Sequence, residues 1–178
     1  MSVKNIVLVH GGFVDGSGWE PVYKILKKDG YNVRIVQNPT LSLADDVAVT
    51  ATYLADDGLV GGLQQGAVVC DTSTVAPVTV RSLDPLVAQQ GATLLDTPVS
   101  GSVPGVEAGT LAVMVGGDQA ALERARPVLE TFAKSIFHLG GVGAGATMKL
   151  VVNSLVHSLN VAVSEALVLA RWPGWTGK

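Results

Sequence analysis

Two short stretches of the sequence combine residue types that could bind and protonate a small anion. Residues 93–110, TLLDTPVSGSVPGVEAGT, place Gly, Ser and Pro directly after an apolar run, and residues 143–153, GAGATMKLVVN, place Lys149 and Asn153 four positions apart. Side chains four apart share one face of a helix. Small residues let backbone N–H groups approach a carboxylate closely, and an amine can supply a proton. Taken alone, however, Lys149 and Asn153 are more typical of a solvated helix surface.

Composition narrows the classes of partner. A chain of 178 residues can bury one core, and its 48% hydrophobic content is high for a soluble protein. The formal net charge is −3, and Lys and Arg do not cluster. This pattern argues against nucleic acid or an anionic membrane as the main partner and favours a small neutral or anionic ligand.

Cysteine and histidine usage predicts no metal site. Cys70 lies in the apolar run GAVVCDTST and is typical of a small core residue. His10, His138 and His157 lack metal-ligand spacing with one another or with the cysteine. His10 is interpreted as a turn residue.

The ends of the chain bear on localisation. The N-terminus MSVKNIVLVHGG has too short an apolar run for a signal peptide, which predicts a cytoplasmic protein. Residues 148–170 form the most apolar segment, but Lys, Asn, His and Glu interrupt it, so we do not expect a membrane span. Trp172 and Trp175 in the tail are expected to cover an apolar edge.

Apolar periodicity predicts alternating strands and helices. The expected strands are 4–9, 31–36, 67–71, 92–96, 111–117 and 135–140, and the expected helices are 17–30, 41–57, 78–90, 118–133 and 145–171. The fold class is therefore α/β: a Rossmann-like three-layer sandwich with a mainly parallel sheet, followed by one long C-terminal helix. We expect a domain over 1–142, the long helix over 143–171 and a tail over 172–178. Asp71 and Asp96, at strand ends, are expected to hydrogen-bond the loops that follow them.

Four ordered motifs between about residues 56 and 170 resemble the β-hydroxyacid dehydrogenase family, which includes 3-hydroxyisobutyrate dehydrogenases and glyoxylate/succinic semialdehyde reductases. The motifs are DTSTVAP (71–77), DTPVSGSVPGVEAGTL (96–111), MVGGD (114–118) and GAGATMKLVVN (143–153). The resemblance implies that Lys149 is the catalytic acid/base and Asn153 its neighbour at the substrate. It also implies that Ser100, Gly101 and Ser102 bind the substrate carboxylate; the family often has Gly where Ser102 stands.

The chemistry of such a reaction suits these residue types. Hydride transfer to a carbonyl creates an alkoxide, which must be stabilised and protonated as it forms. Lys149 could do both. The implied partner is a small anionic substrate.

The first fifty residues resemble a different family. Residues 1–50 are similar to the start of α/β-hydrolases, in which an H-G-G-F loop contributes to the oxyanion hole; here the loop reads His10–Gly11–Gly12–Phe13. A hydrolase of this kind needs a G-x-S-x-G nucleophile elbow, and that motif is absent from the sequence. Esterase activity is therefore the least favoured function. The combination suggests a chimera of a hydrolase-like βαβ unit, 1–50, and a dehydrogenase-like portion, 56–142.

A Rossmann overlay defines the expected cofactor site. The dehydrogenase family opens with G-x-G-x-x-G, and on that pattern Gly11 and Gly16 take the first and third positions while Phe13 takes the second. The other cofactor-binding candidates are Gly12, Asn38, Thr40 and Thr74. Phe13 and Pro39 depart from the family pattern, so NADP or NAD is expected to bind weakly if at all.

Three functions remain open at this level. The first is a truncated, chimeric NAD(P)-dependent 3-hydroxyacid dehydrogenase-like protein with at best residual dinucleotide binding or oxidoreductase activity. The second is a catalytically inactive, self-associating folded module, and the third is an α/β-hydrolase-type esterase. The helix over 148–170 spreads apolar residues over more than one stripe, which predicts a homodimer that buries it.

Overall fold

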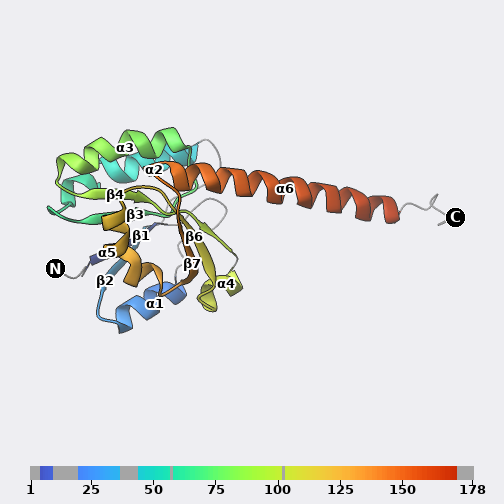
Figure 1. Ribbon diagram of the computed structural model, residues 1–178, viewed down its shortest axis with the longest axis horizontal. Helices are drawn as coiled ribbons and strands as arrows, with labels where there is room; N and C mark the ends of the chain where they lie inside the picture. Colours follow the sequence, from blue (N-terminus) through green and yellow to red (C-terminus); the bar gives the residue numbers. More distant parts are fainter. Residues whose placement is uncertain (1–4, 10–19, 37–43, 57, 102, 172–178) are drawn as a thin grey trace.

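The computed structural model describes residues 5–9, 20–36, 44–56, 58–101 and 103–171 (Figure 1). The strands are β1 (Asn5–Val9), β2 (Asn32–Val36), β3 (Val68–Asp71), β4 (Thr93–Asp96), β5 (Val99–Ser100), β6 (Leu111–Val115) and β7 (Ala133–His138). The helices are α1 (Glu20–Lys28), α2 (Ala44–Leu54), the 3-10 turn η2 (Val60–Gly62), α3 (Pro77–Gln89), α4 (Val103–Glu107), α5 (Gln119–Leu129) and α6 (Ala144–Ala170). The expected Rossmann-like α/β fold with a long C-terminal helix is confirmed.

Helices cover both faces of the strands, as the three-layer expectation requires (Figure 1). The buried side chains divide into two clusters, and adjacent residues of β4 belong to different ones: Leu95 packs with α1 and α5, whereas Leu94 packs with α2 and α3. Successive side chains of a strand point to opposite faces, so a strand covered on both sides must be apolar at every position. This is why the segments predicted as strands do not alternate between apolar and polar residues.

The sheet differs from a single parallel sheet in two ways. Within the described part of the chain, backbone hydrogen bonds join β1 to β2, β3 to β4, and β5 to β6 to β7, with one isolated bridge from Asp96 to Gly116 linking β4 and β6. In addition, β5 runs antiparallel to β6. A parallel neighbour needs a crossover of a dozen or more residues, and the ten residues between β5 and β6 are too few for one. The sequence analysis missed β5 and the short α4.

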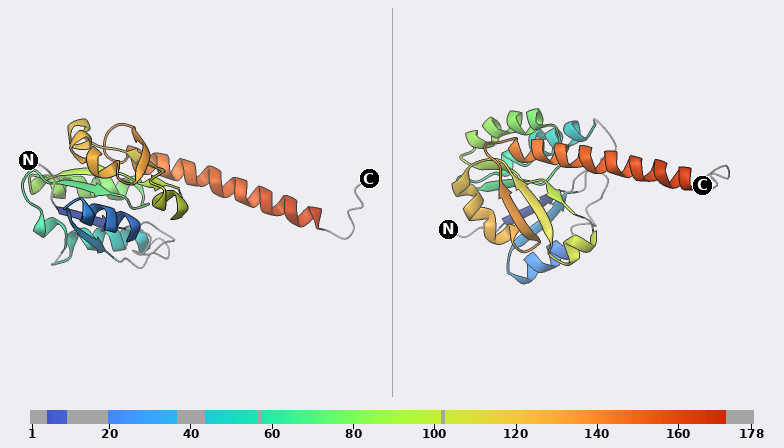
Figure 2. Two further views of the ribbon diagram at one scale, coloured as in Figure 1. Left: turned by 90° about the horizontal axis from the view of Figure 1, so that it is seen from below. Right: turned by 45° about the vertical axis from the view of Figure 1, so that its right-hand side comes forward.

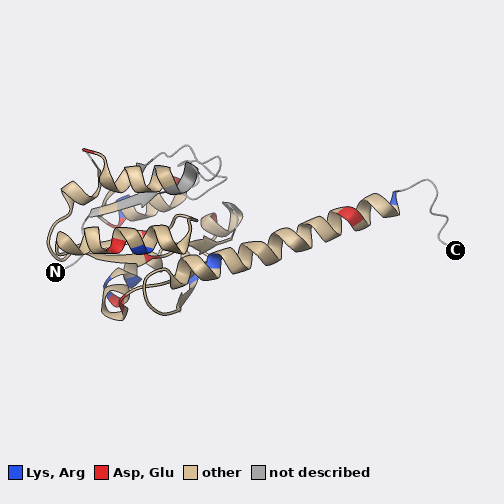
Figure 3. Cartoon of the chain, turned by 90° about the horizontal axis from the view of Figure 1, so that it is seen from above, with Lys and Arg blue, Asp and Glu red and all other residues tan. Residues whose placement is uncertain are grey.

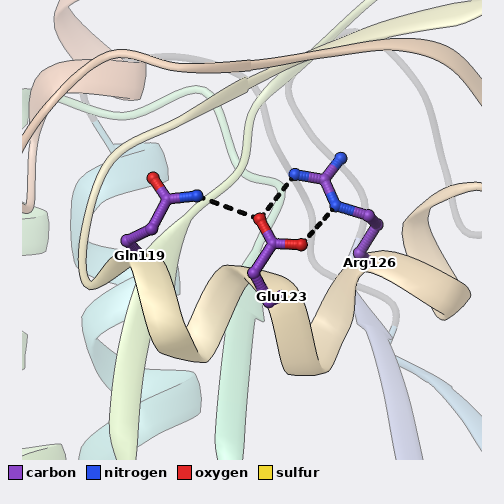
Figure 4. Close-up of polar contacts among 3 residues, drawn as sticks. All are labelled: Gln119, Glu123 and Arg126. Atoms are coloured by element: carbon purple, nitrogen blue, oxygen red, sulfur yellow. Dashed lines mark hydrogen bonds and ion pairs between the residues drawn. The ribbon is translucent and has the colours of Figure 1, made fainter.

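Helix α5 has a side-chain cap at its start and a set of side-chain hydrogen bonds on its exposed face. The Asp118 carboxylate accepts a hydrogen bond from the backbone N–H of Ala121 at 2.8 Å and caps the helix. On its exposed face, Glu123 accepts hydrogen bonds from Gln119 at 2.9 Å and from two guanidinium nitrogens of Arg126 at 2.7 Å (Figure 4). The hydrogen bonds from Arg126 lower the pKa of Glu123. Exposed pairs of this kind add little to stability, so the buried face anchors α5.

Helix α6 leaves the body of the protein and extends away from it (Figures 1 and 2). Gly145 and Ala146 are its buried residues, and every residue from Ser154 to Arg171 is exposed. Large apolar side chains make up much of that exposed length; Leu155 is 63% exposed and Leu159 is 55% exposed. Lys149 and Glu165 are the charged residues of α6, so most of its length carries no charge (Figure 3).

By length and composition, α6 would also be able to cross a membrane, with a mean hydropathy of 1.3 over its most apolar window. Core helices of soluble proteins meet the same criterion while buried, whereas the most apolar window of α6 is exposed in the structure.

We predict that α6 is buried in a homodimer whose interface is centred on residues 148–170. Replacing Leu155 and Leu159 together by Glu should shift the protein from dimer to monomer in multi-angle light scattering, because charges would enter the interface. The matched control is Val78→Glu on α3, which alters an equally exposed apolar side chain and should leave the dimer intact. A wild-type monomer at micromolar concentration would contradict the prediction.

Candidate functional site

The polar residues at the ends of β3 and β4 form a buried pair of carboxylates. Asp71 and Asp96 are register partners, 4% and 1% exposed respectively. Asp71 accepts hydrogen bonds from the Tyr53 hydroxyl at 2.9 Å and from the backbone N–H of Ser73 at 2.8 Å. Burial and the charge of Asp71 raise the pKa of Tyr53 well above its ordinary value, so Tyr53 remains a donor. The expectation that Asp71 bonds its following loop is confirmed, and its bond to Tyr53 is an addition.

Asp96 behaves differently from the expectation, because the described donors to its carboxylate lie outside the loop that follows β4. Its two oxygens accept hydrogen bonds from the backbone N–H groups of Gly143 and Ala146, each at 2.7 Å. These residues begin α6, whose N-cap, Gly143, has no capping side chain of its own. The first N–H groups of a helix lack partners within it and carry partial positive charge. Asp96, at the end of β4, therefore caps α6 although it lies 47 residues before the N-cap Gly143.

Two glycines allow this close approach. A Cβ atom on Gly116 would collide with the Asp96 carboxylate, and one on Gly145 would collide with the backbone oxygens of Met114 and Asp96. Gly116 also exchanges two backbone hydrogen bonds with Asp96, of 2.8 and 3.0 Å. The beginning of α6 is thus held directly against β4 and β6. The sequence signal for this contact is the small-residue stretch GAGAT at residues 143–147.

Lys149 and Asn153 lie on the docked side of α6. Lys149 follows Gly145 by four residues and Ala146 by three, and both Lys149 and Asn153 are half-buried while their neighbours Met148 and Leu150 are exposed. Burial lowers the pKa of Lys149, with no charged neighbour contributing to the shift. The structure therefore places the two candidates together on one partly desolvated face. Their catalytic role remains a prediction.

The Ser-Gly loop is held against β6, the strand that the start of α6 also contacts. Ser100 is half-buried and pairs with Ala112 of β6, two positions before Met114, where α6 begins its contact. At about 3.3 Å per residue, the two points on β6 are roughly 7 Å apart. Gly101 has a φ of +145°, and a Cβ there would collide with the side chain of Leu111. Glycine is therefore required at position 101, both for its positive φ and because a Cβ atom would not fit beside Leu111.

Hydroxyl groups at the same end of the strands have unused hydrogen-bonding capacity. Ser73 Oγ and Thr97 Oγ1 are buried, and neither has a hydrogen-bond partner among the described residues. Thr74, a cofactor-binding candidate, follows Ser73 and is half-buried. The carboxyl ends of parallel strands are where α/β sheets bind nucleotides, so these hydroxyls fit a polar ligand there. The remaining candidates lie outside the described residues: Ser102, His10, Gly11, Gly12, Phe13, Gly16, Asn38, Pro39, Thr40, Trp172 and Trp175.

A second feature is an apolar cavity of about 250 Å³ along β3, on the side away from β4. Tyr53, Leu63, Cys70 and Phe132 line it, together with Ile6 of β1. Cys70 packs against the core cluster, as expected, and burial together with the charge of Asp71 raises the pKa of its thiol to about 12. The thiol is therefore protonated and unreactive at neutral pH. Among the described residues, no cluster of His, Cys, Asp and Glu could hold a metal ion.

Comparison with curated proteins points to dehydrogenases. The chain is 43% identical over 130 residues to an NAD-dependent L-serine dehydrogenase of Pseudomonas aeruginosa, covering 73% of this chain and 44% of that protein. It is 46% identical over 121 residues to a 3-hydroxyisobutyrate dehydrogenase of the same organism, covering 68% and 41%. The chain thus spans less than half the length of these relatives.

Solved structures agree. A Mycobacterium tuberculosis 3-hydroxyisobutyrate dehydrogenase with L-serine superposes with a TM-score of 0.70 at 31% identity, covering 94% of this chain and 65% of that one. The protein Psf3, in complex with NADP+ and 2-OPP, superposes with a TM-score of 0.72 at 26% identity, covering 93% and 66%.

The family match extends through most of the described body. Residues 22–140 match the family described as the NAD binding domain of 6-phosphogluconate dehydrogenase. The match begins inside α1, within the segment that resembles hydrolases, and ends just before α6. Together with the α/β architecture and the relatives above, it shows that this chain belongs to the family of the NAD-binding domain of 6-phosphogluconate dehydrogenase and carries the NAD-binding domain of the 3-hydroxyisobutyrate dehydrogenases.

Proposed function

We propose that the chain acts in NAD(P)-dependent interconversion of a small 3-hydroxyacid and its semialdehyde, with Lys149 as the proton donor and acceptor. The observation that carries this proposal is the partly desolvated amine of Lys149, on the docked face of α6 beside Asn153. The ammonium group of an ordinary surface lysine is solvated by water, so its pKa is not lowered by burial. A lysine held at the carboxyl ends of the strands suits acid/base chemistry on a ligand bound there.

Each residue has a defined task in the proposed reaction. Bound NADPH or NADH would supply the hydride. The Ser100–Ser102 loop would hold the substrate carboxylate through its hydroxyl and backbone N–H groups, which places the carbonyl near Lys149. As the carbonyl oxygen becomes an alkoxide, the Lys149 ammonium donates one proton to it and becomes a neutral amine. Asn153, one turn further on, would donate a hydrogen bond to the same oxygen and orient it.

The cofactor would lie over the ends of β1 to β4. Thr74 is the described residue in the proposed set, and the spare hydroxyls of Ser73 and Thr97 support a polar ligand nearby. The other members are Gly11, Gly12, Gly16, Asn38 and Thr40. The hydrolase-like character of residues 1–50, and hence the chimera, is part of the proposal: it puts Phe13 and Pro39 where small or cationic residues would favour phosphate.

One alternative has a specific observation in its favour. The exposed apolar surface of α6 suits a catalytically inactive module that only self-associates. A protein of that kind would form the dimer but show no response to NADPH. An esterase is less favoured, because a G-x-S-x-G elbow is absent from the sequence.

Cofactor affinity tests the first part of the proposal. Phe13→Gly should tighten NADPH binding in a fluorescence titration, because it removes a side chain from the position where the backbone must approach the pyrophosphate. The control Phe137→Gly, which removes an exposed ring on β7, should leave affinity unchanged. Equal or weaker binding by the Phe13 variant would show that the overlay on the glycine motif is misplaced.

Catalysis tests the second part. Lys149→Ala should lower any reduction of glyoxylate or a small semialdehyde by at least about a hundredfold, since a general acid contributes factors of that size. Lys134→Ala, an exposed lysine on β7, is the control and should not change the rate. Donation requires the ammonium form, and burial lowers the pKa of Lys149, so reduction should decline with rising pH earlier than an ordinary lysine would dictate. Activity that survives Lys149→Ala would place the chemistry elsewhere.

A further inference from the structure

The beginning of α6 is fixed by a charged group that the proposed reaction does not use. Asp96 is 1% exposed, and its two oxygens accept hydrogen bonds from Gly143 and Ala146, each at 2.7 Å. A buried carboxylate is costly unless it is hydrogen-bonded, and the N-terminus of a helix offers both N–H donors and a favourable dipole. The interaction therefore stabilises one specific position of the helix relative to β4.

Steric contacts define the same position independently. Gly145 packs so closely that a Cβ would meet the backbone oxygens of Met114 and Asp96, and a Cβ on Gly116 would meet the Asp96 carboxylate. From α3, the Arg81 guanidinium donates a hydrogen bond to the carbonyl oxygen of Val142 at 3.2 Å, which holds the turn before the helix. The helix cannot move inward because of the backbone contacts, and the carboxylate opposes movement outward.

The partial burial of Lys149 depends on this docking. Lys149 lies one turn beyond the two residues that contact the sheet, and beyond Asn153 every residue of the helix is exposed. The amine is therefore at the outer limit of the docked face, where a small outward tilt of the helix would return it to water. The shift in its pKa comes from burial alone, so no neighbouring charge would preserve it after such a tilt.

Charged groups around the docking point do not offer another explanation. Asp84 on α3 is partly buried, and its pKa is raised first by burial and then by the charge of Asp96. Arg81 is directed to a backbone carbonyl. Within the described chain, the ion pairs are Lys24–Glu20 and Arg126–Glu123, and neither involves Lys149.

We propose that Asp96 is the positioning residue for Lys149: its carboxylate caps α6 and so sets the depth at which the amine is held beside the substrate. Asp96 does not touch the reacting atoms and acts only through the helix. The functional meaning of this role rests on the proposed function of Lys149, but the structural link between the two residues does not.

The test measures the protonation of Lys149 directly, without any requirement for activity. The lysines are labelled by reductive methylation with 13C, the Lys149 signal is assigned from Lys149→Arg, and its pKa is followed by NMR in the whole chain. In Asp96→Ala the pKa should rise toward the ordinary lysine value, because α6 loses its anchor and the amine becomes solvated. Asp96→Asn, which keeps one acceptor oxygen, should give a smaller rise.

A matched control separates positioning from general loss of stability. Asp118→Ala removes an equivalent carboxylate cap, that of α5, and should leave the pKa of Lys149 unchanged. If Asp96→Ala does not fold, Gly145→Ala replaces it, since the added Cβ pushes α6 outward with the carboxylate intact, and the pKa should again rise. An unchanged pKa in the folded Asp96 or Gly145 variant, or an equal rise in Asp118→Ala, would overturn the proposal.

Activity distinguishes this proposal from the function on which it rests. If Lys149→Ala retains reductase activity, the proposed function fails, while the pKa measurement still decides whether Asp96 sets the environment of the amine. If Lys149→Ala loses activity and Asp96→Asn lowers kcat with little change in KM, both proposals are supported.

Discussion

The hydrogen bonds from the start of α6 to the Asp96 carboxylate are the constraint on which the arrangement of the candidate site depends. They join β4 to a helix whose N-cap, Gly143, lies 47 residues later, at the point where β4 also bridges to β6 through Gly116. A carboxylate buried in this way must be fully hydrogen-bonded to be tolerated, and the unpaired N–H groups of a helix start need acceptors. Each group satisfies the other's requirement. Everything that α6 carries toward the body, including Lys149, takes its position from this contact.

Strand β6 is the common support for the two halves of the site. On one edge it pairs with β5, which carries Ser100, and near Met114 its backbone touches the first turn of α6. Its other edge pairs with β7, so the strand is held on both sides and by the buried cluster beneath it. Loops that bind ligands are precise only when rigid elements carry them. The short antiparallel β5 achieves this for a loop that would otherwise follow β4 without support.

The N-terminal unit of β1, α1 and β2 is held to the rest of the protein by side-chain packing. Among the described residues, β1 and β2 bond to each other and not to β3, so the unit is joined to the body by side chains: Val22, Leu26 and Val33 enter the same buried cluster as Leu95. Apolar packing is less directional than a strand ladder, so it constrains the position of the unit less tightly. The family match from residue 22 includes most of α1 and all of β2. The hydrolase resemblance of the preceding loop remains an interpretation of its residues.

The sequence alone determined the local elements and the grouping of Lys149 with Asn153, because periodicity, caps and breakers act within a few residues. Asp118 caps α5 through its own side chain, Gly30 ends the first helical segment with a φ of +85°, and residues four apart share a helix face wherever the helix lies. The local bond from Ser73 to Asp71 follows the expectation from the sequence, but tertiary structure alone decided the distant partners of the two carboxylates. Asp96 bonds N–H groups 47 and 50 residues away, and Asp71 bonds a tyrosine 18 residues before it. Sequence reasoning assigned both acids to their neighbouring loops, since a short-range rule was the only one available; which distant donors meet a buried carboxylate depends on how the strands and helices pack, and no local pattern encodes that.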